Sequence, residues 1–319
     1  MAYKFNVTLP GLEKNVPVKE ITAKQYRELV KSLYNKDGDV FLEHINSIIE
    51  DTVPGILQEQ LTVVDYLILL LTSRMICINP DIKFNSTCPD TKKQFESIIR
   101  MEDIINKLST VKSKNVFTKN AYKITYSLLK ANNIIPVYKL DRQLEMYYHF
   151  ISSIDEIQIN EQIFNICSLP FNKKIIIIEN LPIEISNKIY SDLIANYKEI
   201  NKLTLFEIKS PYTKKVIFDN VLKITVEDVF ELLKLLFNDD LSNIYKLSYN
   251  LVSMAGYTPE YLDCITPAEQ FLYWSLHLQR VNKENESNKE DSKQPLPSYD
   301  GLNLPSRKKN SQSEFTVEN

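Results

Sequence analysis

Histidines, carboxylates and cysteines are the residues of this chain that are suited to acid–base, nucleophilic or metal chemistry. The three histidines, His44, His149 and His277, lie singly among apolar residues of three different expected helices. A catalytic histidine needs a neighbouring polar group that orients the ring and shares its proton. Histidines without such neighbours are typical of packed or partly exposed helix positions, so their pattern does not indicate a catalytic site.

The carboxylates and cysteines give no stronger signal of catalysis. Adjacent carboxylates occur before an expected strand and at expected helix ends, where capping and helix dipoles explain them. The cysteines lie far apart and form no C-x-x-C pair, which argues against a disulfide framework and fits a reduced, cytosolic setting. We therefore expect no enzymatic activity and no cofactor or metal. The carboxylate pairs are Asp155-Glu156, Glu227-Asp228 and Asp239-Asp240, and the cysteines are Cys77, Cys88, Cys167 and Cys264.

Two six-residue segments share a pattern. Residues 88–93 are Cys-Pro-Asp-Thr-Lys-Lys and residues 210–215 are Ser-Pro-Tyr-Thr-Lys-Lys, and each follows a β-rich run. Turn chemistry alone favours proline at such positions, so one explanation is a chance match. The other is a pair of knuckle-like turns, each closing a hairpin. The sequence leaves both interpretations open.

The elements that position these residues begin with a helical N-terminal unit, residues 1–78. Alternating apolar residues predict a hairpin over 3–21 that turns near Pro10-Gly11. Residues 22–25 form a capping box for a helix to about residue 35, and a second helix is expected over 40–50. The third helix, 62–77, is apolar almost all round, so we expect it at the centre of the unit.

Residues 79–110 are expected to form the first β-hairpin, and residues 111–223 a mixed α/β middle that contains the second. In the first part, residues 101–108 fit either a helical turn or an edge strand. In the mixed part, four consecutive isoleucines favour a strand that is covered on both faces. The patterns there predict strands over 116–129, 156–159 and 174–179, helices over 140–153 and 182–200, and the second hairpin over 203–218.

The C-terminal unit, residues 224–282, is predicted to contain three amphipathic helices. The first has a one-sided apolar stripe over 226–237. The second ends at Gly256, where a left-handed residue is expected, and continues this spacing through Leu241, Ile244, Tyr245, Leu251, Val252 and Ala255. A hydroxyl, a proline and a carboxylate over 266–269 start the third helix.

The last segment, residues 283–319, has a different composition. It is rich in Asn, Ser, Glu and Lys and contains three prolines, so we expect a disordered tail. Its apolar island, residues 295–302, is either a docking segment that orders on a partner or part of a plain solvated tail.

Composition limits the classes of fold and function. Apolar residues at 44% and charged residues at 25% of 319 match a soluble protein, here of the α+β class and mainly helical. The net charge of -3 gives no general attraction to nucleic acid. Only five glycines argue against dinucleotide folds and P-loops. The most apolar run, 61–78, is interrupted by Asp65 and Arg74 and is too short and polar to span a membrane.

A helical unit with aromatic residues and no catalytic pattern suggests a role in binding other proteins. Exposed aromatic side chains are typical anchors of such contacts. Aromatic residues at helical spacing are also typical of a core, so each remains a candidate. The candidate partner-binding residues are Tyr257, Tyr261, Phe271, Tyr273, Trp274, Leu296, Tyr299 and Leu302.

The chain resembles the baseplate hub subunit family of T-even-like contractile-tailed bacteriophages. The resemblance covers both ends of the chain, and the middle, about 111–200, matches only loosely. It consists of caps and apolar spacing rather than catalytic signatures. The segments that carry it are Leu9-Pro10 with residues 16–20, the hairpin 84–95, and the run 229–278, which includes Asn238-Asp239-Asp240, Tyr257-Thr258-Pro259 and residues 266–273.

The resemblance implies a structural component of the tail baseplate that acts through contacts with other baseplate and tail proteins during assembly. It implies a hetero-oligomeric assembly in the virion, put together in the host cytoplasm, without catalytic chemistry. One alternative is a transient, chaperone-like hub assembly factor that is absent from the mature virion. A less favoured alternative is an adaptor that holds nucleic acid through Lys92-Lys93, Lys214-Lys215 and Arg307-Lys308-Lys309.

The family commonly carries a C-P-x-C-like turn in the first hairpin, and two such turns would complete a tetrahedral zinc site. Here the corresponding positions are Cys88 and Thr91 in the first turn and Ser210 and Thr213 in the second. Hydroxyl groups bind zinc poorly. We therefore expect no structural zinc and expect packing to hold the two hairpins together.

Overall fold

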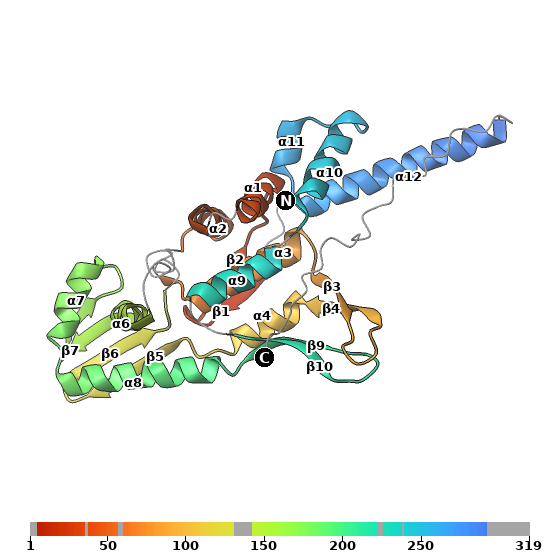
Figure 1. The fold of residues 1–319 in the computed structure, drawn as a ribbon. Helices are drawn as coiled ribbons and strands as arrows, with labels where there is room; N and C mark the ends of the chain where they lie inside the picture. Colours follow the sequence, from red (N-terminus) through yellow and green to blue (C-terminus); the bar gives the residue numbers. More distant parts are fainter. Residues whose placement is uncertain are drawn as a thin grey trace.

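The computed structural model describes residues 5–35, 38–56, 60–130, 142–222, 226–237 and 239–291. As predicted, the fold is α+β and mainly helical, with small antiparallel sheets (Figure 1). A helical body is flanked on one side by the mixed segment and on the other by the C-terminal helices. Two hairpins extend from the body beside one another.

The N-terminal segment forms the predicted hairpin and helices. Strands β1 (Phe5–Leu9) and β2 (Lys14–Val18) pair in antiparallel register with one buried face. Helix α1 (Ala23–Tyr34) begins with the expected capping box, in which Thr22 and Gln25 satisfy each other's backbone amides. Helix α2 (Gly38–Thr52) follows and packs on α1.

Helix α3 (Val63–Cys77) is the centre of the body, as its all-round apolar sequence predicts. Nearly all of its residues are buried, and it contacts α2, β1, β2 and α4. Its first turn is held by the buried Asp65 carboxylate, which accepts hydrogen bonds from the Thr62 backbone and hydroxyl and from the Gly11 amide at 2.8 Å. Burial outweighs these donors and raises the pKa of Asp65 above its ordinary value.

The first protruding hairpin consists of β3 (Asp81–Thr87) and β4 (Gln94–Arg100), as predicted. Residues 101–108, for which the sequence allowed a helical turn or a strand, belong to helix α4 (Met101–Ser109). Its apolar side contains Met101, Ile104 and Leu108, which are buried, and the helix packs on α3. The hairpin is thereby anchored to the central helix.

The mixed segment contains a four-stranded antiparallel sheet in the order β5-β6-β7-β8. The single strand predicted over 116–129 is two strands, because Asn120 adopts a left-handed turn conformation with φ of 55°. Strand β8 was not predicted. The strands are β5 (Lys114–Lys119), β6 (Tyr122–Ser127), β7 (Ile154–Ile159) and β8 (Gln162–Asn165), with α6 (Arg142–Ser153), α7 (Phe171–Glu179) and α8 (Ile183–Ile200) beside them.

The prediction of a strand over 174–179 is wrong, because these residues form the second half of α7. The helix starts directly after Pro170 and packs against α6, where the rings of Phe171 and Tyr148 stack with centroids 4.0 Å apart. Only one side of the isoleucine run is covered: Ile178 is buried and Ile176 is 61% exposed. Tertiary packing of a helix therefore overrides the β-propensity of the isoleucines.

The chain returns to the body through the second predicted hairpin and ends in the C-terminal helices. Gly256 has φ of 78°, which confirms the expected left-handed residue after α10. The last helix continues past residue 283, where a disordered tail was predicted to start, and residues 292–319 lie outside the described part of the chain. The elements are β9 (Thr204–Lys209), β10 (Val216–Val221), α9 (Val226–Phe237), α10 (Leu241–Ser253), α11 (Pro259–Cys264) and α12 (Pro267–Asp291).

The described residues contain two hydrophobic cores. The large core runs from β1 to the end of α9, and a small one forms under α10–α12 around Leu247, Leu251, Leu262 and Trp274. Polar contacts connect the two parts of the chain. Arg27 on α1 makes a two-point ion pair with Asp263 on α11, with nitrogen–oxygen distances of 2.7 and 3.1 Å.

A buried cationic contact lies near the end of α9. Arg74 of α3 donates to the Asp239 carboxylate at 3.0 Å and to the Tyr26 hydroxyl at 3.2 Å, and Tyr26 itself donates to Asp239. The Arg74 guanidinium also lies 5.6 Å from the centre of the Phe237 ring. This contact joins α3, α1 and the segment between α9 and α10, so it fixes where the C-terminal helices leave the body.

Substitution of Gly11 by alanine is expected to lower the free energy of unfolding by about 2 kcal/mol, because the added carbon meets a packed polar site. An ideal Cβ at this position would lie 2.1 Å from the Asp65 carboxylate. Chemical denaturation measures the change. Lys14→Ala, an exposed change in β2, is the control and is expected to shift stability by less than about 0.5 kcal/mol. Equal effects of the two substitutions would contradict the role of Gly11.

Arg74→Met is expected to lower the free energy of unfolding by about 2–3 kcal/mol, because it leaves the Asp239 carboxylate without its cation. The Arg74 side chain is only 4% exposed, whereas Asp239 is 23% exposed, which places the effect at the lower end for buried pairs. Lys188→Met removes an exposed pair with Asp192 and is the control, with an expected change below about 0.5 kcal/mol. Chemical denaturation of both variants measures these changes, and equal losses of stability would contradict the role of Arg74.

Candidate protein-binding site

The two six-residue segments with related sequences adopt the same turn; we call residues 88–93 and 210–215 together the paired turns. In the first, the Cys88 amide donates to the Lys93 carbonyl at 2.9 Å and the Lys92 amide to the Cys88 carbonyl at 2.8 Å. In the second, Ser210 exchanges the same two hydrogen bonds with Lys215 and Lys214, both at 2.9 Å. This shared geometry supports the interpretation as knuckle-like turns.

The paired turns lie against each other, although 122 positions separate the first residues of the two segments (210 minus 88). The Cys88 sulfur is 4.0 Å from the Thr213 hydroxyl oxygen. Hydrogen bonds from the hydroxyl groups of Ser210 and then Thr91 lower the pKa of the Cys88 thiol to about 6. The side chains of Thr91, Ser210 and Thr213 therefore converge around the sulfur of Cys88.

The chemistry of these four side chains is unsuited to zinc, because three of them offer neutral hydroxyl groups. Among the described residues, no three His, Cys, Asp or Glu side chains are placed to hold a metal ion. Contacts between the turns hold the hairpins together instead. Phe95 and Tyr212 pack edge to face at 6.2 Å, Lys93 lies 5.4 Å from the centre of the Tyr212 ring, and Lys215 pairs with Asp90 at 2.9 Å.

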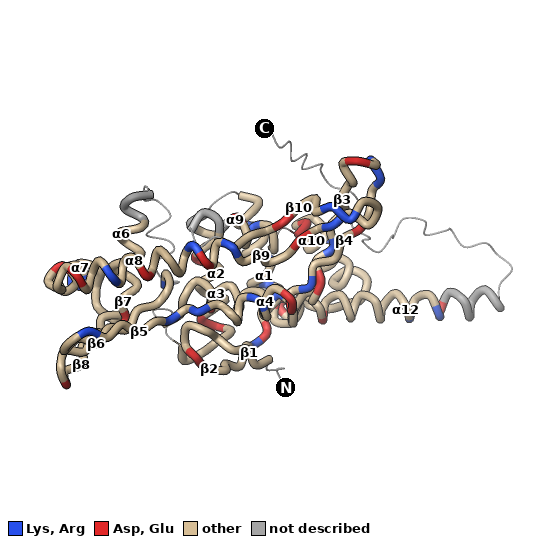
Figure 2. The backbone as a smooth tube through the Cα atoms, turned by 90° about the horizontal axis from the view of Figure 1, so that it is seen from below, with Lys and Arg blue, Asp and Glu red and all other residues tan. Residues whose placement is uncertain are grey.

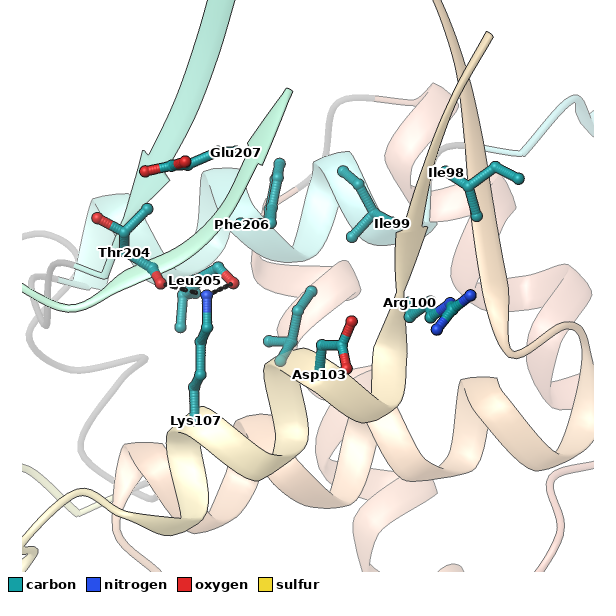
Figure 3. A pocket seen from close by; sticks show the side chains of 10 residues that line it. Ile98, Ile99, Arg100, Asp103, Lys107, Thr204, Leu205, Phe206 and Glu207 are labelled. Carbon is teal, nitrogen blue, oxygen red and sulfur yellow. Dashed lines mark hydrogen bonds between the residues drawn. The ribbon is translucent and has the colours of Figure 1, made fainter. Parts of the chain in front are cut away.

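A groove of about 360 Å³ opens where the hairpins meet α4 (Figure 3). Its walls are consecutive residues of β4 (98–100) and β9 (204–207), with Asp103, Ile104 and Lys107 of α4 between them. The Lys107 ammonium donates to the carbonyls of Thr204 and Leu205, both at 2.9 Å. These bonds attach the second hairpin to α4, so Lys107 positions the paired turns.

Three of the predicted partner-binding residues form a stacked cluster. The rings of Tyr257, Tyr261 and Tyr273 lie nearly parallel with centroids 5.3–6.4 Å apart, and the hydroxyl oxygens of Tyr261 and Tyr273 are 3.2 Å apart. The hydrogen bond with Tyr261 raises the pKa of Tyr273 to about 12. Tyr261 is 45% exposed and Phe271 is 47% exposed, so both are available at the surface of α11 and α12.

Trp274 does not suit the predicted role of a surface anchor. It is 6% exposed and packs with Leu247, Leu251 and Leu262 in the small core, and its ring stacks on His277 at 5.4 Å. Its position on the inner side of α12 explains this burial. Leu296, Tyr299 and Leu302 lie outside the described residues.

The sequence reasoning missed exposed apolar residues of α10 and α12. Tyr245, Tyr249 and Val252 are exposed along one side of α10, and the opposite side buries Leu247 and Leu251. The expected stripe is therefore wrong at Tyr245 and Val252 and correct at Leu251. On α12, Leu272 and Leu276 are 53% and 50% exposed. The spacing of the two tyrosines and Val252 was visible in the sequence, but it did not show which side faces the core.

The histidines do not gather into a site. His44 lies on α2, His149 on α6 and His277 on α12. His149 is buried, with its Nδ1 3.2 Å from the Tyr197 hydroxyl, and His277 stacks on Trp274. The rings of His149 and His277 thus take part in local hydrogen bonding or packing.

Exposed aromatic and aliphatic residues on outer helices are typical of surfaces that contact other proteins. Within the described ranges, no helix is long and apolar enough to cross a membrane.

The family model of the T4 bacteriophage base plate protein matches residues 1–242, which is 242 of the 319 residues. The chain therefore belongs to this family and has a structural role in a phage baseplate. Searches of curated proteins and of solved structures found no match. Family membership implies a location in the phage baseplate, in contact with other baseplate proteins.

Cys88→Ser is expected to cost more stability at high pH than at low pH. A thiol whose pKa falls from about 9 to about 6 on folding stabilises the fold fully above pH 9, and this contribution is lost as the pH falls through 6. The difference in melting temperature between wild type and C88S should therefore be larger at the alkaline end. Cys264→Ser, on an exposed cysteine outside the paired turns, is the control, and the test is that C88S shows the larger change of this difference with pH. If the difference in melting temperature between wild type and C88S does not change with pH, Cys88 is not a thiolate in the folded protein.

Proposed function

We propose that the protein is a subunit of the central hub of a contractile-tail baseplate and acts through protein–protein contacts during tail assembly in the host cytoplasm. The family match supports the baseplate, and the resemblance over residues 229–278 supports the hub. The observation that carries the proposal is the exposed apolar surface of the C-terminal helices. The exposed apolar residues of these helices are the predicted Tyr261 and Phe271, together with Tyr245, Tyr249, Val252, Leu272 and Leu276.

The C-terminal helices are suited to present such a surface. Their small core is built from only a few buried side chains, and ion pairs from α1 and α3 fix their position on the body. Exposed aromatic residues on a positioned helical unit are typical anchors of protein interfaces. Chemical groups for catalysis do not gather near them in the described part of the chain.

Quantitative mass spectrometry of purified virions tests the structural role. A hub subunit is expected at a fixed copy number relative to the other baseplate proteins. Absence from the virion, with presence in assembly intermediates, would instead support a transient hub assembly factor.

Substitution of the exposed residues tests the surface. Tyr249→Ser with Leu272→Ser is expected to reduce co-purification with baseplate proteins from infected cells by roughly tenfold or more, because two apolar anchors are lost. Ile163→Ser with Ile183→Ser is the matched control, since these side chains are 61% and 75% exposed on the mixed segment. If the control variant loses more co-purification than the test variant, the interface lies on the mixed segment and not on the C-terminal helices.

A further inference from the structure

The paired turns bring together lysines from two distant parts of the chain; we call Lys92, Lys93, Lys214 and Lys215 the basic tip. The loop between β3 and β4 and the loop between β9 and β10 carry these lysines, and Figure 2 shows the end of the β3–β4 hairpin extending from the body. Within the paired turns, the four lysines are opposed by a single carboxylate, Asp90, whereas the whole chain has a net charge of -3. The basic tip is therefore a local reversal of the protein's charge.

Two of these lysines have a backbone conformation that is uncommon for lysine. Lys92 has φ of 56° and Lys214 has φ of 61°. This left-handed region is unfavourable for a residue with a long side chain, and glycine or asparagine usually occupies it. The hairpin turns at Asn120 and Asn160 follow that rule, whereas the β1–β2 turn has Glu13 in this region with φ of 53°. Both paired turns have lysine at this position, although turn formation favours other residues.

The four lysines divide into two roles. Lys93 lies over the Tyr212 ring and Lys215 pairs with Asp90, so these two side chains join the hairpins. Lys92 and Lys214 are exposed, and within the described part of the chain neither contacts a carboxylate. The contacts of the first pair hold the second pair at a fixed place on the surface. Exposed ammonium groups on a backbone that is held in place are suited to bind carboxylates that a partner supplies.

We propose that the basic tip is a docking surface for an acidic segment of a partner protein in the baseplate. This inference rests on the proposed function for its partner class, and it assigns a second contact surface apart from the C-terminal helices. The charges favour a protein segment over nucleic acid, because the patch is small and contains Asp90, and because the whole chain is acidic. A long nucleic acid would extend beyond the tip and meet the net negative charge of the rest of the chain, whereas a short acidic segment meets mainly the lysines.

The test is a titration of the full-length protein with a fluorescein-labelled oligoglutamate peptide, followed by fluorescence anisotropy. The variant is Lys92→Asn with Lys214→Asn, because asparagine suits the left-handed backbone and preserves the turns while removing both charges. The double variant is expected to bind the peptide roughly tenfold more weakly than wild type, and added salt should weaken wild-type binding.

The matched control is Lys123→Gln with Lys202→Gln, which removes two exposed lysines on β6 and after α8. This control should bind the peptide as wild type does. Equal weakening in both variants would show a general charge effect and overturn the proposal. Tighter, Lys92- and Lys214-dependent binding of an oligothymidylate of equal charge would overturn it in favour of nucleic acid. The titration is independent of virion composition, so its failure and the failure of the hub assignment are distinguishable.

Discussion

The burial of α3 on all sides is the constraint on which the rest of the structure depends. A helix without an exposed face must be covered by other elements, and here α2, the β1–β2 hairpin and α4 provide that cover. The helix also has to begin inside the protein, where its free amides and the Asp65 carboxylate need partners. The Gly11 amide is one of those partners, so the first hairpin is fixed on α3 by a polar contact as well as by packing.

The surfaces that we associate with function are attached to this centre by specific polar contacts. Arg74 connects α3 to the start of the C-terminal helices, and Lys107 connects α4 to the second hairpin. Each cation bridges segments that are far apart in sequence. Directional bonds of this kind fix orientation better than apolar packing does, because apolar contacts tolerate sliding and directed hydrogen bonds do not.

Local signals in the sequence were sufficient for the parts of the fold that short-range interactions decide. The capping box at Thr22 and the left-handed Gly256 are of this type, because their partners lie within a few residues. The isoleucine run in α7 was misassigned because a short apolar segment fits either a strand or a helix, and its neighbours decide. The stripe expected on α10 is wrong at Tyr245 and Val252, though correct at Leu251, for a related reason. Both of its sides carry apolar residues, and only the packing of α11 and α12 selects Leu247 and Leu251 for the core.

The candidate sites were predictable only in part. Tyr257, Tyr261 and Tyr273 were selected from composition, but their stacking depends on the angle between α11 and α12, which no local pattern specifies. The similar sequences of the paired turns were visible at once. Their contact was not, because it depends on how α4 and Lys107 place two hairpins that are encoded far apart.

Helix α12 has a geometric consequence for any assembly that contains this protein. Its 25 residues give a rod about 38 Å long at the usual rise per residue, and its far end extends beyond the body (Figure 1). A rod of this length sets the distance between proteins that bind at its far end and proteins that bind to the body. A neighbour that binds near Asp291 sits farther from the central helix than one that binds at the hairpins, so a single copy of this chain has the reach to separate two neighbours by a defined distance.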